Sequence, residues 1–441
     1  MGRRFPASSA ERLTSGPGNL LSVVSLVSRI VTVVARRELA RVMSFDQRGN
    51  LEIPPGDARP RMLYLHVPFC ERLCPYCSFH RVPFQDRLAR EYFAALRKEI
   101  TLYRDRGYNF SGIYAGGGTP TVLIDELEET LNHARQSFRI GEVSVETNPN
   151  HLTEPVLAAL KRAGVSRLSV GIQSFDDGLL RAMDRFEKYG SGAAVAERLK
   201  AALGRFETLN VDMMFNLPSQ TPAMLDHDLG ILTDARLDQI TYYPLMVSDD
   251  TRYLVERRLG RVDSRQERRF YRQIVRRLVP TYTFSSAWCF SMRTVRSAID
   301  EYIVRHDEYA GLGSGAIGYL NGRCYANTFD IPTYIARVNR GESPVQAARE
   351  FSLRERMRYD FLTGLFATRL DPTNLRRKYG VRLAWYLGPD LLAFWLAGEL
   401  RWDEAGLRLT QPGLYTWVIM MREFFSAVNN FRDQCRRGAV P

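Results

Sequence analysis

The sequence contains few cysteines, six among 441 residues. Small secreted proteins that depend on disulfides carry many cysteines, spread as pairs along a short chain. Here Cys289, Cys324 and Cys435 are scattered singly, and the other three cysteines are clustered. The cysteine content therefore excludes a disulfide scaffold and predicts a reducing, cytoplasmic environment. It also indicates that the cluster has a role other than cross-linking.

A long uninterrupted hydrophobic run is also missing. The most apolar stretch, Leu20 to Val34 within residues 19–43, is interrupted by Arg29 and is short for a membrane span. It lacks the small residues of a signal-peptide cleavage site. At helical spacing its apolar side chains share one face, with arginines near the edges. Two interpretations stay open: a helix packed on the protein's own core, or an interfacial helix on an anionic membrane surface.

Basic residues outnumber acidic ones, 61 against 49, and the formal net charge is +12. The excess is diffuse, and no basic motif interleaved with aromatic residues indicates RNA binding. The charge therefore predicts a small-molecule substrate rather than a nucleic acid. With 45% hydrophobic residues and no low-complexity tract, the chain is expected to form a large folded core.

From residue 61 onward, short apolar runs alternate with helical segments. Such alternation predicts right-handed βαβ units and a parallel sheet. Six units in one series indicate an α/β fold, a partial TIM-like (β/α)6 barrel, with polar residues at the carboxyl ends of its strands. The expected strands lie in 62–67, 110–123, 142–149, 167–175, 210–218 and 239–247, and the expected helices in 86–105, 124–138, 153–164, a segment ending near 184 and one opening near Thr221.

Composition divides the chain into three parts. Residues 1–60 are expected to form an N-terminal extension with the amphipathic helix, and residues 61–344 the partial barrel. Residues 345–441 are rich in helix formers and predict a smaller C-terminal domain with a hairpin at 400–413.

The clustered cysteines, Cys70, Cys74 and Cys77, have the spacing CxxxCxxC. This spacing fits neither paired zinc knuckles nor the redox CxxC motif. A zinc ion needs a fourth ligand, for which His66 or His80 would have to serve. Three thiolates on one tight loop suit three irons of a [4Fe–4S] cluster and leave the fourth iron open to a small molecule. The spacing therefore favours an iron–sulfur cluster over zinc.

The cysteine loop resembles that of the radical S-adenosylmethionine (SAM) enzymes. The resemblance spans residues 61–430 and includes Tyr64 and His66 before Cys70, followed by GGGTPT, VETNP, RLSVGIQSF, VDMMFNLP and GLGSGAIGYL. These motifs resemble the subfamily around oxygen-independent coproporphyrinogen III oxidase (HemN), which also holds heme chaperones, heme-opening enzymes and class C radical methyltransferases. The resemblance implies a mostly helical C-terminal domain of the HemN type. It also implies that SAM binds the open iron and that an electron, from a donor such as flavodoxin or ferredoxin, cleaves SAM to a 5′-deoxyadenosyl radical.

These motifs contain candidates for SAM binding, but the resemblance assigns no catalytic acid or base. The glycine turn at 116–118 follows a strand, and we expect it to let the backbone approach SAM where a Cβ would block the contact. By resemblance Glu146 binds the ribose, since a carboxylate can accept from both hydroxyls. Taken alone, such residues also have structural interpretations: a loop, a surface arginine or plain core. The expected cofactor contacts are Tyr64, Gly117, Gly118, Thr119, Glu146, Gln173, Arg185 and Asp212, with Leu245 and Ile317 against the adenine or a second cofactor.

Two departures distinguish the chain from well-known members of the subfamily. Coproporphyrinogen oxidases carry a fourth cysteine two residues after the third, where this chain has Phe79. Heme chaperones carry an HNxxYW signature, where this chain keeps His306 and Tyr309 but lacks the Asn and the Trp. Both functions therefore become less favoured.

Residues 298–329 and 420–433 look most like the enzymes that methylate menaquinone at C8. That resemblance implies a class C methyltransferase with two SAM molecules, one cleaved to a radical and one donating its methyl group to an sp² ring carbon. We therefore expect a radical SAM methyltransferase with a quinone substrate, cytoplasmic and in peripheral contact with the inner face of the membrane. The alternative is a tetrapyrrole protein: a coproporphyrinogen oxidase-like enzyme, a heme-degrading radical methyltransferase or a heme chaperone.

Overall fold

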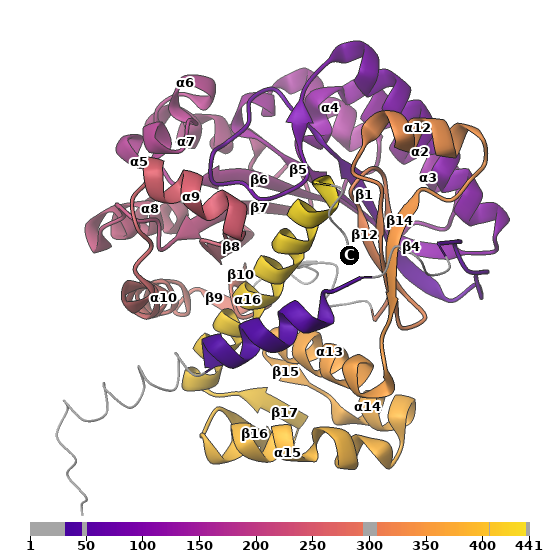
Figure 1. The fold of residues 1–441 in the computed structure, drawn as a ribbon. Coiled ribbons are helices and arrows are strands. Elements are labelled where there is room, and N and C mark those ends of the chain that lie inside the picture. Colours follow the sequence, from indigo (N-terminus) through magenta and orange to yellow (C-terminus); the bar gives the residue numbers. More distant parts are fainter. Residues whose placement is uncertain (1–30, 46–50, 294–306, 405, 438–441) are drawn as a thin grey trace, which may run out of the picture.

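The computed structural model describes residues 31–45, 51–293, 307–404 and 406–437 (Figure 1). Its centre is a twelve-stranded sheet in the order β14-β13-β12-β11-β1-β4-β5-β6-β7-β8-β10-β9. The six expected strands lie at the middle of this order, and neighbours among them pair in parallel. They are β1 (Pro60–Val67), β4 (Asn109–Gly117), β5 (Glu142–Thr147), β6 (Arg167–Gln173), β7 (Thr208–Phe215) and β8 (Gln239–Pro244).

The two edges of the sheet are built from strands that the sequence did not predict. β11 (Tyr309–Leu312) pairs in parallel with β1, and three antiparallel strands continue from it. At the other edge β10 pairs antiparallel with β8 and with β9. The sheet is therefore a partial barrel whose two edges do not pair. The remaining edge strands are β12 (Ile317–Leu320), β13 (Arg323–Asn327), β14 (Val345–Glu350), β9 (Tyr282–Phe284) and β10 (Cys289–Met292).

Helices join the parallel strands, which confirms the predicted partial (β/α)6 barrel. All but the first residue of β1 are buried, as expected for a parallel strand covered on both sides. Between β6 and β7 the chain forms two further helices that were not predicted, α6 (Phe186–Tyr189) and α7 (Gly192–Ala202). The helices that matched the expected segments are α2 (Asp86–Asp105), α3 (Ile124–Ser137), α4 (Glu154–Arg162), α5 (Asp177–Ala182) and α8 (Pro222–Asp234).

The C-terminal residues form a lobe beside the barrel and a long helix that returns to it. Strand β14 follows the expected boundary at residue 345 but pairs with β13 in the main sheet, so we place the start of the lobe at α13. The expected hairpin is present as β16 and β17. In Figure 1, α16 runs from this lobe across the open side of the sheet. The elements are α13 (Leu353–Phe366), β15 (Arg369–Leu370), α14 (Pro372–Tyr379), α15 (Arg382–Leu396), β16 (Leu400–Asp403), β17 (Gly406–Leu409) and α16 (Gln411–Arg436).

Only part of the predicted N-terminal helix lies within the described residues, where 31–42 are helical. Leu39 and Val42 pack against the hydrophobic core, and Arg36 donates to Glu423 of α16 at 2.8 Å. Val33 and Val34 are exposed. The described part is therefore packed on the protein itself along one side. Within the described residues, none of the helices combines the length and the apolar character that crossing a membrane requires.

A buried carboxylate joins the barrel to the edge of the sheet that carries the GLGSGAIGYL motif. Glu99 of α2 accepts hydrogen bonds from the backbone N–H of Gly313 at 2.8 Å, the side-chain amide of Asn327 at 3.0 Å and the hydroxyl of Tyr334 at 2.6 Å. Its burial raises its pKa to about 7. Because Gly313 follows β11 and Tyr334 lies in α12 (Ile331–Asn339), one side chain holds three separate segments in place.

We predict that Glu99→Ala lowers the free energy of unfolding by about 3 kcal/mol, because it removes the acceptor of the buried Gly313 N–H and Tyr334 hydroxyl and one of the acceptors of Asn327. Urea denaturation followed by circular dichroism measures the change. The matched control is Glu91→Ala on the same helix, where the carboxylate is exposed and pairs with Arg87. A loss in the Glu99 variant no larger than that of the control would contradict this role.

Candidate active site

A pocket of about 260 Å³ lies at the carboxyl ends of the parallel strands. Ligands of barrels and open parallel sheets bind at this end. The pocket is lined by the ends of the strands, by the cysteine loop and by residues of α16. The expected residues that line it are Cys70, Cys74, Cys77, Tyr64, Gly117, Gly118, Thr119, Glu146, Gln173, Arg185 and Asp212.

Positive charge and hydrogen-bond donors surround the cysteine loop. The guanidinium of Arg81 donates to the carbonyls of Cys74 and Cys77, at 2.5 and 2.8 Å, and so ties two turns of the loop together. The Sγ of Cys70 accepts from the hydroxyl of Thr119 at 3.7 Å. Arg185 donates to the Sγ of Cys74, also at 3.7 Å. Such neighbours favour thiolates, the form in which cysteine binds metal. At Cys70 burial outweighs them and raises the pKa of the thiol to about 11.

The two histidines that were considered as zinc ligands have other protein groups as hydrogen-bond neighbours. His66 is fully buried, which lowers its pKa to about 3, so the ring is neutral and has one N–H. Its Nε2 donates to the carbonyl of His80 at 2.9 Å, and its Nδ1 therefore accepts from the hydroxyl of Tyr64 at 2.8 Å. The Nε2 of His80 lies 3.3 Å from the hydroxyl of Ser314. His66 thus joins the strand before the loop to the residue after it.

The three cysteines fit an iron–sulfur cluster. Cys70, Cys74 and Cys77 line one pocket. In a [4Fe–4S] cluster each cysteine binds a different iron, so three cysteines on one loop suit three of its irons. Zinc would need a fourth ligand, and the ring nitrogens of His66 already bond to protein groups.

The glycines of the GGG turn are required by the protein's own packing. A Cβ on Gly116 would lie 2.8 Å from the Glu146 carboxyl group, and one on Gly118 would lie 2.6 Å from the backbone oxygen of Phe69. On Gly117, whose φ is +113°, a Cβ would lie 2.6 Å from the ring of His66. These glycines were expected to let the backbone approach SAM, which stays a prediction. The structure adds a second reason, because the end of β4 packs against Glu146, His66 and the backbone before Cys70.

Two carboxylates face the pocket in fixed positions. Glu146, at the end of β5, accepts from the hydroxyl of Tyr114 at 2.8 Å and from the backbone N–H of Gly117 at 3.1 Å. Asp212 of β7 accepts from side chains of β6 and β7 at 2.7 and 2.8 Å. Burial, assisted by the charge of Asp212, raises the pKa of Glu146 to about 7. These acceptors are therefore positioned to bind the hydroxyl groups of a ligand.

Arg185 is buried beside the cysteines and keeps an unused donor. Its guanidinium donates to the carbonyl of Gly171 at 2.5 Å and to the hydroxyl of Tyr76 at 3.2 Å, and it lies 4.4 Å from the ring centre of Tyr189. Its Nε is buried and has no hydrogen-bond partner among the described residues. A buried cation with an unsatisfied N–H suits the carboxylate of a bound molecule.

Two expected contacts lie elsewhere. Leu245 lines a neighbouring cavity, whereas Pro244 and Met246 line the active-site pocket. The reason is that successive residues of an extended segment point to opposite sides. Ile317 lies in β12, where it is buried in the core and pairs with Ala326.

Other residues of the pocket were missed by sequence reasoning. Tyr76 and Arg81 belong to the cysteine loop, and their closeness to the cysteines in the sequence could have indicated that they line the pocket. Asn429 and Arg432 lie in α16, far along the chain, and no local pattern indicates that they reach the site. The guanidinium of Arg432 lies 4.9 Å from the ring centre of Phe79, the residue at the position of a fourth cysteine in the oxidases.

Comparisons with known proteins agree with this geometry. Residues 64–232 match the radical SAM superfamily. The chain is 29% identical to the heme chaperone HemW of Bacillus subtilis, over 79% of this chain and 95% of that protein. It is 30% identical to the heme chaperone HemW of Lactococcus lactis, over 63% of this chain and 74% of that protein.

The fold is that of a solved radical SAM enzyme. The crystal structure of coproporphyrinogen III oxidase (HemN) from Escherichia coli superposes with a TM-score of 0.70 and covers 83% of this chain and 90% of its own, at 22% sequence identity. The chain therefore belongs to the radical SAM superfamily, in its coproporphyrinogen oxidase-like branch, a membership that implies a [4Fe–4S] cluster and SAM as cofactors.

Proposed function

We propose that this protein is a radical SAM enzyme that acts on a tetrapyrrole. The observation that carries the proposal is that Cys70, Cys74 and Cys77 line one pocket together with a buried cation, Arg185, and a buried acid, Glu146. In this proposal the three thiolates would hold three irons of the cluster, which would supply the electron for the cleavage of SAM.

The remaining pocket residues would bind and orient SAM. We propose that the free Nε of Arg185 binds its carboxylate and that Glu146 accepts from the ribose hydroxyls. Asp212 and Gln173 lie on the same wall and would restrict the position of the sugar. Tyr64 also lines the pocket, and its hydroxyl donates to His66, which supports the entry to the cysteine loop.

The comparisons favour the tetrapyrrole alternative over the quinone methyltransferase that the sequence analysis placed first. The relatives described above are named for heme and for coproporphyrinogen, and both molecules are tetrapyrroles. Methylation of menaquinone has no support among them. Two SAM molecules per active site and a flavodoxin or ferredoxin donor stay predictions of the family resemblance.

Product analysis tests the proposal. The anaerobically reconstituted enzyme is given SAM and a chemical reductant, with coproporphyrinogen III, heme or a demethylated menaquinone in parallel. We expect 5′-deoxyadenosine formation to be stimulated by a tetrapyrrole, and that tetrapyrrole to be consumed. Release of carbon dioxide would identify decarboxylation, and S-adenosylhomocysteine with an opened ring would identify a second SAM and methyl transfer. A methylated quinone as the product, with both tetrapyrroles unchanged, would refute the proposal.

The same assay tests the cluster ligands. We predict that Cys74→Ala loses the visible sulfur-to-iron absorbance and all cleavage of SAM, because only two thiolates remain. The matched control is Cys324→Ala, which removes a buried thiol of β13 that lies outside the pocket. Equal iron content and SAM cleavage in the two variants would show that Cys74 is not a ligand.

Glu146 predicts that SAM binding depends on pH. With a pKa raised to about 7, its carboxyl group is mostly protonated at lower pH and becomes a full acceptor only as pH rises. SAM affinity of the cluster-loaded enzyme, measured by equilibrium dialysis, should therefore increase about tenfold from about pH 6 to about pH 8. Glu146→Gln should bind SAM more weakly with a flat profile, and an equal increase in that variant would exclude Glu146 as the titrating group.

A further inference from the structure

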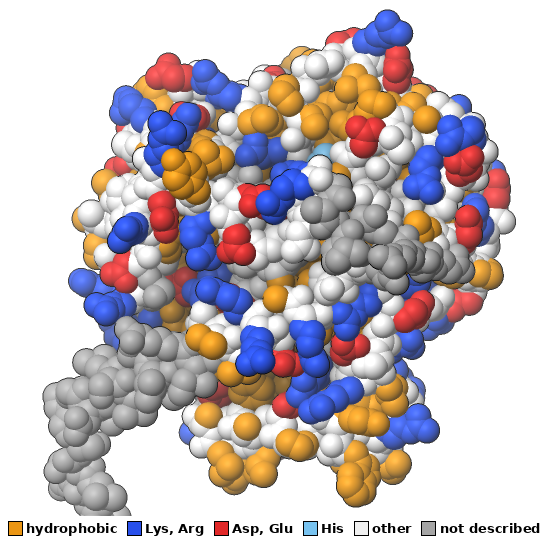
Figure 2. Space-filling model, in the orientation of Figure 1, with side chains coloured by type: hydrophobic (Ala, Val, Ile, Leu, Met, Phe, Trp, Pro, Cys, Tyr) orange, Lys and Arg blue, Asp and Glu red, His pale blue; other side chains and the backbone are white. Residues whose placement is uncertain are grey.

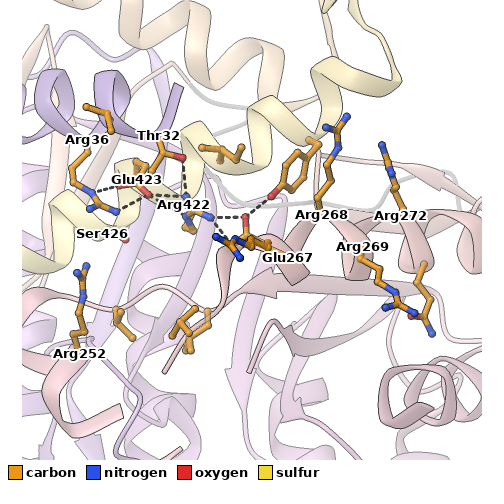
Figure 3. Close-up of a pocket in the computed structure, with 18 of the residues that line it drawn as sticks. Thr32, Arg36, Arg252, Glu267, Arg268, Arg269, Arg272, Arg422, Glu423 and Ser426 are labelled. Carbon is orange, nitrogen blue, oxygen red and sulfur yellow. Dashed lines mark hydrogen bonds and ion pairs between the residues drawn. The ribbon is translucent and has the colours of Figure 1, made fainter. Parts of the chain in front are cut away.

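A second cavity, of about 1190 Å³, adjoins the active-site pocket (Figure 3). It lies between α9 (Asp249–Arg258), α10 (Ser264–Leu278), α16 and the helical residues 31–42. Nine arginines and four acidic residues line it. This arginine cavity is therefore strongly positive, an excess that none of the proposed roles explains.

The buried acids of the arginine cavity are already neutralised by protein groups. Both carboxylate oxygens of Glu267 lie 2.5 Å from Arg422, and Tyr415 donates to the same carboxylate at 3.1 Å. Glu423 accepts from Arg36 at 2.8 Å and from Arg422 at 2.9 Å. Figure 3 shows these pairs grouped at one end of the cavity, with Arg268, Arg269 and Arg272 at the other.

The arginines of α10 form the positive wall. Arg265, Arg269, Arg272 and Arg276 are three or four residues apart, so they share one face of the helix. In the part of the chain that the structure describes, no carboxylate lies within ion-pair distance of any of these four. Burial, together with the charge of Arg272, lowers the pKa of Arg268. The four side chains are exposed, so this face presents positive charge that an anionic ligand can pair with.

The opposite wall is apolar and is shared with the active site. Residues 244–247 alternate between the two spaces. Leu245 and Val247 line the arginine cavity, and Pro244 and Met246 line the pocket that contains the cysteines. Helix α16 also contributes to both, since Ile419 and Ser426 face the cavity and Phe425 and Asn429 face the pocket. The arginine cavity and the SAM pocket therefore share one extended segment and one helix as part of their lining.

We infer that the arginine cavity binds the carboxylate side chains of the substrate. This inference rests on the proposed function, because a tetrapyrrole combines an apolar ring with several propionate groups, and the cavity combines an apolar wall with unpaired guanidinium groups. Arginine binds carboxylates through two parallel hydrogen bonds, which also orients the ligand. A neutral quinone ring would leave this charge unmatched.

Binding of coproporphyrin III, a stable porphyrin with four propionates, tests the inference. The variant is Arg269→Ala/Arg272→Ala in the cluster-loaded enzyme with SAM, and equilibrium dialysis measures Kd. We expect Kd to rise roughly 10- to 100-fold, since two charged hydrogen-bonding partners are lost. The matched control, Arg257→Ala/Arg261→Ala, removes the same charge from exposed positions that do not line the cavity, and it should bind as the unchanged enzyme does.

The outcomes separate this inference from the proposed function. Equal Kd values for the unchanged enzyme and both variants would overturn the arginine cavity as the carboxylate site while leaving a tetrapyrrole substrate possible elsewhere. Absence of porphyrin binding by the unchanged enzyme, with SAM still cleaved, would overturn the proposed substrate and this inference together. Unchanged cleavage of SAM in the Arg269/Arg272 variant confirms that the neighbouring pocket is intact.

A different surface carries a second, independent inference. Large apolar side chains project from α15 and β16, among them Trp385, which is 84% exposed, Trp395 and Trp402. Figure 2 shows hydrophobic side chains protruding at the lower end of the molecule, where Figure 1 places these elements. Proteins rarely expose so many large apolar groups together without a binding role. We call this the tryptophan surface.

We propose that the tryptophan surface binds an anionic membrane. Tryptophan prefers the boundary between lipid and water, because its ring is apolar and its N–H is polar. Exposed arginines lie beside it, and for Arg376, Arg377, Arg382 and Arg401 the described residues provide no carboxylate within ion-pair distance. Arginine next to projecting apolar groups complements an anionic lipid headgroup.

Vesicle sedimentation tests this proposal. We expect the intact protein to sediment with vesicles of phosphatidylglycerol and phosphatidylcholine, and weakly with pure phosphatidylcholine. Trp385→Ser/Trp395→Ser should lose most of the binding. Tyr253→Ser/Leu254→Ser, which removes exposed apolar groups from α9, should keep it. Failure of the unchanged protein to sediment, or its association into dimers that the tryptophan variant abolishes, would overturn a membrane role.

Discussion

The active site depends on one buried histidine. His66 ends the segment that enters the cysteine loop, and its side chain bonds the carbonyl of His80, where the loop ends. The carbonyl of His66 accepts from Tyr92 of α2 at 2.5 Å, and its ring occupies the space where Gly117 would otherwise carry a Cβ. Three segments thus meet at this residue, through its ring and its backbone carbonyl, so it helps to fix the position of the cysteine loop.

The open side of the barrel is closed by α16, and this explains why the two cavities are neighbours. A complete barrel would have continued its sheet there, whereas here a single helix presents one set of side chains to the cysteine pocket and another to the arginine cavity. Its Arg422 is paired with Glu267, and its Arg432 covers Phe79. The same helix therefore shapes the site of SAM chemistry and the proposed site for acidic groups of the substrate.

Arginine has three distinct roles in this protein, set by its surroundings. Arg81 and Arg185 are buried beside the cysteines and donate to backbone and sulfur. On α10 the arginines face a cavity without carboxylate partners in the described structure, and around α15 they border projecting tryptophans. The arginines that contribute to the net charge of +12 therefore have different roles, which composition alone does not distinguish.

Local patterns in the sequence determined the parallel strands, the helices between them and the cysteine triad. These features depend on residues close together in the chain: alternating strand and helix periods, and a three-cysteine loop. Most of the other expected pocket residues came from the resemblance to radical SAM enzymes. Only the tertiary structure decided that Leu245 lines the arginine cavity, that the glycines pack against His66 and Glu146, and that α16 and α10 build the second cavity. Those outcomes arise from contacts between segments far apart in the chain, where the direction of each side chain is set by packing and not by local pattern.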